Sequence, residues 1–371
     1  MPPKLIFHIG QHKAGSTAIQ DAFSTGSVSI EGQRILYTAP LSHNHLPAQF
    51  EAWLKADAAA EVPPVLAALE KKLAEGGYDH AVFSAEDFEW SDPEGVARVL
   101  ERFFLPFFDE MAVICYVRPH AARFLSSYAE RVKIGWFQGG MRDFHAAVVK
   151  DQQFFYAPRL AMWAEVFGAD FHLRPLRRDL LAGGSVVQDF ARTAFGPDAP
   201  VTIAAERISN EALCVEDLVL LRHVQRQLRK LPRLQRHAAG WALAQALLNR
   251  PRAGASTPLA LDRAMAAQIR KTYLADARIL DRSPFAATPV MEQELDRAVD
   301  EAPAEPQSLN PADHFDADEL RRVEAMAELA ATLIAADPKG ARSALTRMRM
   351  GYQASPDQTD EDPSDEDPAD D

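Results

Sequence analysis

Five short apolar stretches are distributed through the first half of the chain. Their apolar positions alternate little with polar ones, which is typical of strands covered on both faces. They span residues 4–10, 34–39, 80–85, 111–118 and 170–176. Between and after them, apolar residues recur at helical spacing near 15–25, 62–75, 93–104, 119–133, 158–167 and 185–195. This order predicts an α/β fold in which helices flank a central parallel β-sheet.

The pattern changes after about residue 205, where helical spacing predominates. We expect a long helix over 210–231, a Pro-, Gly- and Ser-rich loop over 250–258, and helices over 261–280 and around 317–336. The pattern therefore predicts one domain over residues 1–350 whose part from 205 to 350 is mostly helical. The acidic segment 351–371 has too few apolar residues to bury, and we expect it to be disordered.

Composition and charge narrow the class of protein only a little. Of the 371 residues, 47% are hydrophobic and 25% are charged, as in ordinary globular proteins. The net charge is −13, but nine acidic residues lie in 353–371, which leaves −13 + 9 = −4 for the rest. A body so mildly acidic excludes neither a nucleotide nor an anionic acceptor. No apolar run reaches 18 residues and only two cysteines are present, so we expect a cytoplasmic protein without a membrane span.

The loop after the first apolar stretch carries the first candidate chemistry. Residues 8–17 read HIGQHKAGST, and Gly10 and Gly15 match the glycines of the ATPase loop G-x-x-x-x-G-K-[ST]. Ser16 stands where that loop has its lysine, and Thr17 occupies the hydroxyl position. The lysine is Lys13, inside the turn. A glycine-rich turn that leads into a helix offers backbone N–H groups to an anion.

The position of Lys13 bears on which anion is bound. In ATPases the lysine reaches the β- and γ-phosphates from the start of the helix, and the Ser or Thr holds magnesium. A lysine within the turn is better suited to a single 5′-phosphate that carries a transferable group, such as a phosphosulfate. One lysine and the backbone amides could neutralise that group without a metal, and we expect none.

A second motif follows the fourth apolar stretch. The strand predicted there ends at Arg118, and Pro119 is well placed in the first turn of a helix. Ser126 comes eight residues after Arg118 and is followed by Tyr128. An arginine can bind a phosphate as a fork, that is, through two parallel N–H groups. A serine on the adjoining helix can add a hydrogen bond.

Together the two motifs resemble those of sulfotransferases that use 3′-phosphoadenosine 5′-phosphosulfate (PAPS). Bacterial members have H-I-G-x-x-K-T-G-S-T-x-I-Q, and this chain has HIGQHKAGSTAIQ. The departure is Ala14, where the family usually has a hydroxyl residue. The resemblance, which extends over roughly residues 4–290, implies a P-loop NTPase-like sulfotransferase fold with extra C-terminal helices. It also implies PAPS as donor and adenosine 3′,5′-bisphosphate as product. The donor-binding residues it implies are Lys13, Ala14, Gly15, Ser16, Thr17, Arg118 and Ser126.

Sulfuryl transfer to a hydroxyl group requires a base near the attacking oxygen. Glu86 follows a predicted strand in VFSAEDFEW, so it should lie at the carboxyl edge of the sheet near the loop, and Asp87 is its rival. We predict Lys13 and Glu86 as catalytic residues. His43 and His45 are candidates for the acceptor pocket or solvated loop residues, and His12 could approach the donor.

The acceptor is less defined. Trp136, in the loop-like segment 133–144, could stack on a sugar ring. The basic segment 222–237 has two interpretations: a surface that binds an anionic glycan or a lipid surface, or a solvated helix face. We expect a carbohydrate or glycolipid-type hydroxyl, possible peripheral contact with a membrane, and no nucleic acid partner. The sequence gives no basis for an oligomeric state. A P-loop kinase and a non-catalytic nucleotide-binding module are the alternative functions.

Overall fold

A computed structural model describes residues 3–56, 61–204, 212–250, 252–254 and 256–351. Internal contacts divide the chain into two compact units, each built from three segments. The sheet unit comprises Met1–Ser127, His145–Asn210 and Leu261–Pro306. The helical unit comprises Tyr128–Phe144, Glu211–Ala260 and Gln307–Asp371. Residues 261–306, which the sequence assigns to the helical C-terminal part, thus belong to the sheet unit.

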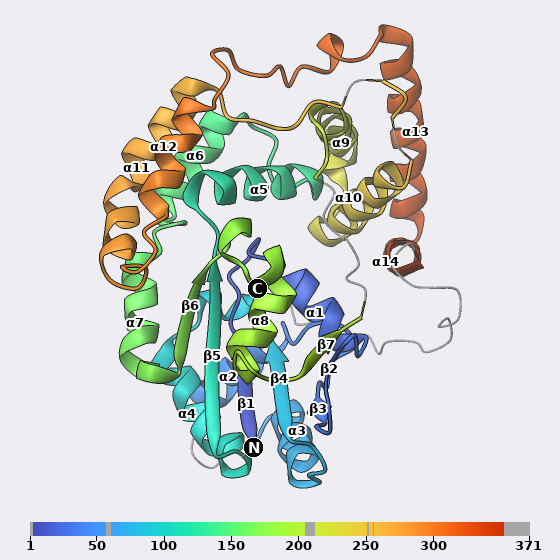
Figure 1. Cartoon of the computed structure of the whole chain (residues 1–371). Coiled ribbons are helices and arrows are strands. Elements are labelled where there is room, and N and C mark those ends of the chain that lie inside the picture. The colour runs from blue at the N-terminus through green and yellow to red at the C-terminus, as the bar shows by residue number, and fades with distance from the viewer. Residues whose placement is uncertain (1–2, 57–60, 205–211, 251, 255, 352–371) are drawn as a thin grey trace. The chain divides into compact units, whose positions relative to one another are not determined.

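The sheet unit is an α/β structure with five parallel strands (Figure 1). The strand order is β3 (Ile35–Leu36), β4 (His80–Ser84), β1 (Lys4–His8), β5 (Glu110–Val117) and β6 (Phe171–Pro175). Each of the five predicted apolar stretches supplies one of these strands, which confirms the predicted α/β class and the parallel sheet. His8 is in register with Ser84 on one side and with Ile114 on the other, so the carboxyl ends of β1 and β4 are level.

Successive residues of the central strands face two separate apolar layers. Ile6 and Val82 pack in a cluster with Phe23 of α1 (Ser16–Ser24) and Phe190 of α8 (Val186–Phe195). On the opposite face, Phe7 meets the rings of Phe50, Phe83, Phe88 and Phe104. Because side chains alternate along a strand, both layers require apolar residues, which explains the continuous pattern in the sequence.

The helices predicted in the first half of the chain are all present. They are α1, α3 (Pro64–Ala74), α4 (Pro93–Phe103), α5 (His120–Lys133), α7 (Ala157–Phe167) and α8. The sequence did not predict α2 (Leu46–Lys55), α6 (Met141–Lys150) or the antiparallel pair β2 (Val28–Ile30) and β7 (Val201–Ile203). The sheet unit also contains α11 (Arg263–Arg282), which is predicted, and α12 (Met291–Asp300), which is not.

The helical unit contains α9 (Val215–Gln227), α10 (Arg233–Leu248), α13 (Ala317–Ala336) and α14 (Pro338–Gly351). The prediction of one helix over 210–231 is wrong, because α9 ends at Gln227 and a 3₁₀ turn follows. Pro232 then caps α10, and proline disfavours a helical conformation in the residue before it. The predicted helix at 317–336 is confirmed as α13. Residues 210–211 and 352–371, including almost all of the predicted disordered tail, lie outside the described residues.

None of the helices within the described ranges is long and apolar enough to cross a membrane.

Candidate functional site

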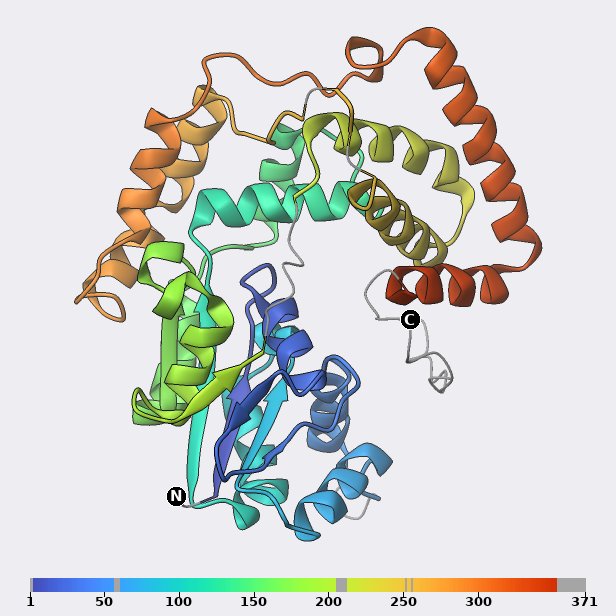
Figure 2. The same ribbon diagram turned by 45° about the vertical axis from the view of Figure 1, so that its right-hand side comes forward.

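The glycine-rich loop joins β1 to α1 and follows β5 beyond the end of β1. The Ile9 N–H donates to the carbonyl of Ile114 at 3.0 Å, and the Gln11 N–H donates to that of Tyr116 at 2.9 Å. Tyr116 returns its own N–H to the Gly10 carbonyl at 2.7 Å. Figure 2 shows the loop and α1 at the arrowhead ends of the strands. Pairing with β5 thus carries the loop to the strand end that precedes Arg118.

The turn itself requires unusual backbone conformations. Lys13 and Gly15 both have positive φ, at 59° and 89°. A Cβ at Gly15 would lie 3.0 Å from the side chain of Val186 on α8, so this position needs glycine for its conformation and for the close approach of α8. The fit between the loop and α8 therefore explains Gly15 independently of any ligand.

The structure accounts for Ala14, which departs from the sulfotransferase pattern. Its side chain is 0% exposed and packs in the same apolar cluster as Ile6 and Phe190. Ser16 is also buried, and its hydroxyl donates to the Gln11 carbonyl at 3.3 Å. Thr17 is exposed, so of these three side chains it presents its hydroxyl to solvent. Because the side chain at position 14 is buried, alanine there contributes to packing, and the absence of a hydroxyl removes no group that faces solvent.

Helix α1 begins in a way that favours an anion. Its N-cap residue is Gly15, which has no side chain to cap the helix, and its first turn contains no acidic residue. The first N–H groups of a helix have no partner within the helix, and the helix dipole places partial positive charge there. An anion at this end would be stabilised by both effects.

Arg118 lies directly beside the turn. Its Nη1 donates to the backbone carbonyl of Lys13 at 3.3 Å, and its own carbonyl accepts from the Tyr156 hydroxyl at 3.0 Å. The guanidinium is half-buried, and burial lowers its pKa, although an arginine remains protonated in proteins. Ser126 is half-buried on α5. The structure thus brings together Lys13 and Arg118, which are more than a hundred residues apart in the sequence.

A buried carboxylate that the sequence analysis did not single out anchors the loop. Glu89 is 2% exposed and accepts from Arg123 at 3.0 Å and from Arg159 at 3.1 Å. It also accepts from the backbone N–H of His12 at 3.0 Å and from the ring Nδ1 at 2.8 Å. Burial alone would raise the pKa of Glu89, but Arg123 and His12 lower it to about 2. Glu89 therefore remains ionised and ties the loop to α5 and α7.

His12 lies between two carboxylates. Its Nδ1 bonds to Glu89, and its Nε2 lies 3.0 Å from Oδ1 of Asp87. Burial alone would lower the pKa of His12, but these hydrogen bonds and the nearby charge of Glu86 raise it to about 9. At neutral pH His12 is an imidazolium that donates through both ring nitrogens. Its charge is balanced by Asp87 and Glu89, and it has no lone pair to act as a base.

We expect the stability of the loop to depend on pH through His12. Its pKa is about 9 in the folded chain against 6.5 for an unperturbed histidine, so protonation stabilises the folded state fully below about pH 6.5. This stabilisation should be lost as pH rises from 6.5 to 9. The Tm advantage of the wild type over His12→Gln should therefore shrink across that interval. His45→Gln, which changes an exposed histidine, is the matched control. A constant difference for His12→Gln would contradict the assignment.

Glu86 lies against the loop, where the sequence analysis expected it. It is the first residue of a 3₁₀ turn after β4, and its N–H donates to Oδ1 of Asn44 at 3.0 Å. A Cβ at Gly10 would come within 3.0 Å of the Cα of Glu86, so the two backbones are in close contact. The side chain is half-buried.

His43 has a structural role in the fold. It is 1% exposed, its Nδ1 accepts from the Ser84 N–H at 3.1 Å, and its Nε2 lies 3.0 Å from the Thr38 hydroxyl. Burial lowers its pKa to about 3. Both ring nitrogens are used within the chain, so the prediction that His43 is a solvated residue or lines an acceptor pocket is wrong. His45 is exposed and precedes α2.

The remaining acceptor candidates belong to the helical unit. Trp136 is 43% exposed, and the guanidinium of Arg233 lies 3.7 Å from the centre of its ring. In the basic segment 222–237, Arg222 donates to the Gln138 carbonyl at 2.6 Å and Arg236 donates to that of Gly135 at 2.8 Å. These arginines hold the 135–138 turn, so part of the charge of the segment is used within the unit.

Within the described residues, no group of three or more His, Cys, Asp or Glu side chains is arranged to hold a metal ion. The chain is thus an α/β protein whose glycine-rich loop, next to Arg118, forms a positively charged candidate anion site. Comparison with protein-family models, with curated proteins and with solved structures gives no match.

Proposed function

We propose that the sheet unit is a PAPS-dependent sulfotransferase that transfers a sulfuryl group to a hydroxyl of a carbohydrate or glycolipid-type acceptor. The observation that carries this proposal is the 3.3 Å contact between Arg118 Nη1 and the Lys13 carbonyl. It places the Arg118 guanidinium against the turn that carries Lys13, and PAPS has an anionic group on both its 3′ and its 5′ oxygen.

The roles of the residues follow from their positions. The first N–H groups of α1 and the ammonium of Lys13 would bind the 5′-phosphosulfate. Arg118 would bind the 3′-phosphate as a fork, with Ser126 as a further hydrogen-bond donor. The family usually has a hydroxyl at position 14, but here the side chain of Ala14 is buried, so that position contributes only backbone.

In the proposed reaction the acceptor oxygen attacks sulfur and the bond between sulfur and the phosphate oxygen breaks. The acceptor proton passes to a base, and adenosine 3′,5′-bisphosphate leaves. The charge that develops on the leaving phosphate would be stabilised by Lys13 and by the first N–H groups of α1. Lys13, the start of α1 and Arg118 would provide the charge that a P-loop kinase takes from its lysine and magnesium.

Glu86 is the best candidate for the base among the groups near the loop. His12 is protonated at neutral pH, and His43 uses both ring nitrogens within the fold. His8 is fully buried and bonded to Ser84 at 2.8 Å, and burial lowers its pKa to about 3. Asp87 is engaged with the ring of His12, which leaves Glu86 as the carboxylate beside Gly10.

Calorimetry with two ligands tests the proposal. We expect adenosine 3′,5′-bisphosphate to bind without a metal, with a dissociation constant on the order of micromolar, and ATP with magnesium to bind at least tenfold more weakly. Preference for ATP with magnesium would instead favour the P-loop kinase. Binding of the bisphosphate without sulfuryl transfer from PAPS to any of a panel of glycan and glycolipid hydroxyls would favour the non-catalytic module.

Replacing Glu86 with glutamine should lower the transfer rate by about 10²–10⁴ while leaving bisphosphate affinity unchanged, because the amide cannot accept the acceptor proton. The rate would be measured with PAPS and a sulfatable acceptor, and affinity by calorimetry. Asp87→Asn is the matched variant, one residue away, and should retain most of the activity. The reverse result, loss in Asp87→Asn alone, would assign the base to Asp87.

A further inference from the structure

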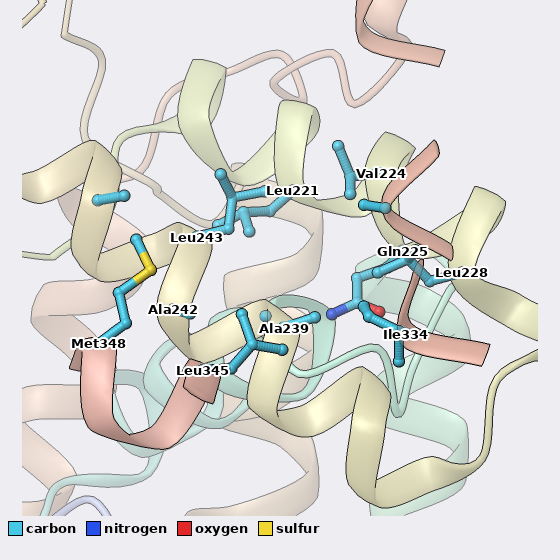
Figure 3. Close-up of a pocket in the computed structure, with 13 residues that line it drawn as sticks. Leu221, Val224, Gln225, Leu228, Ala239, Ala242, Leu243, Ile334, Leu345 and Met348 are labelled. Atoms are coloured by element: carbon cyan, nitrogen blue, oxygen red, sulfur yellow. The ribbon is translucent and has the colours of Figure 1, made fainter. Parts of the chain in front are cut away.

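The helical unit contains an apolar cavity that the proposed transfer reaction does not use. Its volume is about 250 Å³, and α9, α10, α13 and α14 form its walls (Figure 3). Side chains that point into this region include Leu221, Val224, Leu243, Ile334 and Leu345. All these helices belong to the same unit, so the cavity is a property of that unit alone.

Small side chains on two of the helices keep the cavity open. Helix α10 lines it with Ala239, Ala242 and Ala246, which are spaced three and four residues apart and so share one face. Helix α13 adds Ala330. Protein interiors are normally packed to the density of organic crystals, and leucine at these positions would fill the space. The cavity therefore depends on the small side chains of α10 and α13.

The walls of the cavity offer almost no polar groups. The polar residue among those that line it is Gln225, whose Nε2 donates to the carbonyls of Lys133 at 2.9 Å and Arg236 at 3.0 Å. These bonds hold the amide nitrogen against backbone, whereas the amide oxygen is buried without a hydrogen-bond partner. Water in this half-open cavity would find few of the two to four polar partners that a bound water needs, so the apolar walls favour a hydrocarbon over water.

Positive charge gathers on the helix at one wall. Helix α14 contributes Leu345 and Met348 to the cavity, and Met348 is 41% exposed. Between residues 338 and 351 the sequence has four basic residues and no Asp or Glu. Lys339 and Arg347 of this helix are exposed. An anionic group at the surface beside Met348 would therefore meet basic side chains.

We propose that this cavity binds the alkyl chain of an anionic amphiphile, with the chain among the alanines of α10 and α13 and the head group beside α14. A volume below the roughly 300–1,000 Å³ of sites for drug-sized ligands suits a single chain rather than a ring system or a peptide helix. The site does not depend on the proposed sulfotransferase function, because it is formed entirely within the helical unit.

Titration of the full chain with dodecanoate, below its critical micelle concentration and without any nucleotide, tests this inference. We expect one saturable site by calorimetry and a rise in Tm with dodecanoate concentration. Dodecyltrimethylammonium, which has the same chain and a cationic head, should bind more weakly. Absence of saturable dodecanoate binding would overturn the proposal whatever the result with PAPS.

One pair of variants and one charge variant locate the site. Ala330→Phe should weaken dodecanoate binding at least about tenfold, the effect of excluding two methylenes, whereas Ala325→Phe on the exposed face of α13 should not. Arg347→Gln should weaken the binding of dodecanoate about twofold to fivefold and leave the binding of dodecanol unchanged. Circular dichroism and Tm without ligand check folding, and Ala246→Leu replaces Ala330→Phe if the latter unfolds. Equal affinity in Ala330→Phe and wild type, or binding to phosphatidylglycerol vesicles without binding to monomeric dodecanoate, would refute the cavity as the site.

Discussion

Replacing Arg118 with alanine should weaken the binding of adenosine 3′,5′-bisphosphate by a factor on the order of 10–100. A hydrogen bond to a charged group contributes about 1.5–3 kcal/mol, and each 1.4 kcal/mol changes affinity about tenfold. Arg118 is half-buried beside the turn, so solvent screens it less than an arginine on the open surface. Calorimetry with the purified variant measures the effect. Arg118→Lys should recover only part of the affinity, because lysine keeps the charge but not the fork.

A second ligand separates phosphate binding from a structural effect. Adenosine 5′-monophosphate lacks the 3′-phosphate, so its weaker binding should be nearly the same in Arg118→Ala and wild type. Arg118 also donates to the Lys13 carbonyl, and losing that bond could disturb the turn. Equal losses for both ligands would mean that Arg118 holds the loop rather than the 3′-phosphate.

Replacing Lys13 with alanine should lower the transfer rate by about 10²–10³, the usual effect of removing one preorganised group that stabilises charge in the transition state. The backbone of Lys13 has a φ of 59°, and alanine has the same Cβ, so the substitution adds no new strain there. The rate with saturating PAPS and acceptor is the measurement, and bisphosphate affinity is measured alongside it.

The comparison of rate with affinity decides how Lys13 acts. A large fall in rate with a modest fall in affinity is the result that charge stabilisation on the leaving phosphate predicts. Matched falls in both would make Lys13 a binding residue only. Turnover close to that of the wild type would exclude Lys13 from the reaction, and with it the mechanism proposed for the loop.

The parts of the fold that could be predicted from the sequence are those with a strong local signal. The strands of the sheet are buried on both faces, so each is a continuous apolar run, and Gly15 and Arg118 lie at the strand–helix junctions where such sheets bind ligands. Helix α10 was missed because its inner face has alanine where a helical pattern usually has larger apolar residues. Helix α2 was missed because His43 and His45 gave its start the composition of a loop.

The groups that set the charge of the loop could not be predicted, because their partners are distant in the sequence. Glu89 lies 77 residues from His12 and 70 from Arg159, and only the fold brings them together. The segment EDFEW has three acidic residues, which the sequence alone does not distinguish. In the fold Glu89 is buried and anchors the loop, whereas Asp87 is exposed. The protonated state of His12 depends on both and has no local signature.

The interleaving of the two units restricts how the protein can be divided. The chain passes from one unit to the other five times, after residues 127, 144, 210, 260 and 306. Neither unit is therefore a continuous fragment that could be expressed alone or exchanged as a cassette with another protein. A deletion after residue 306 would remove α13 and α14 and leave Leu228 and Leu231, which pack with Ile334, without part of their apolar surroundings.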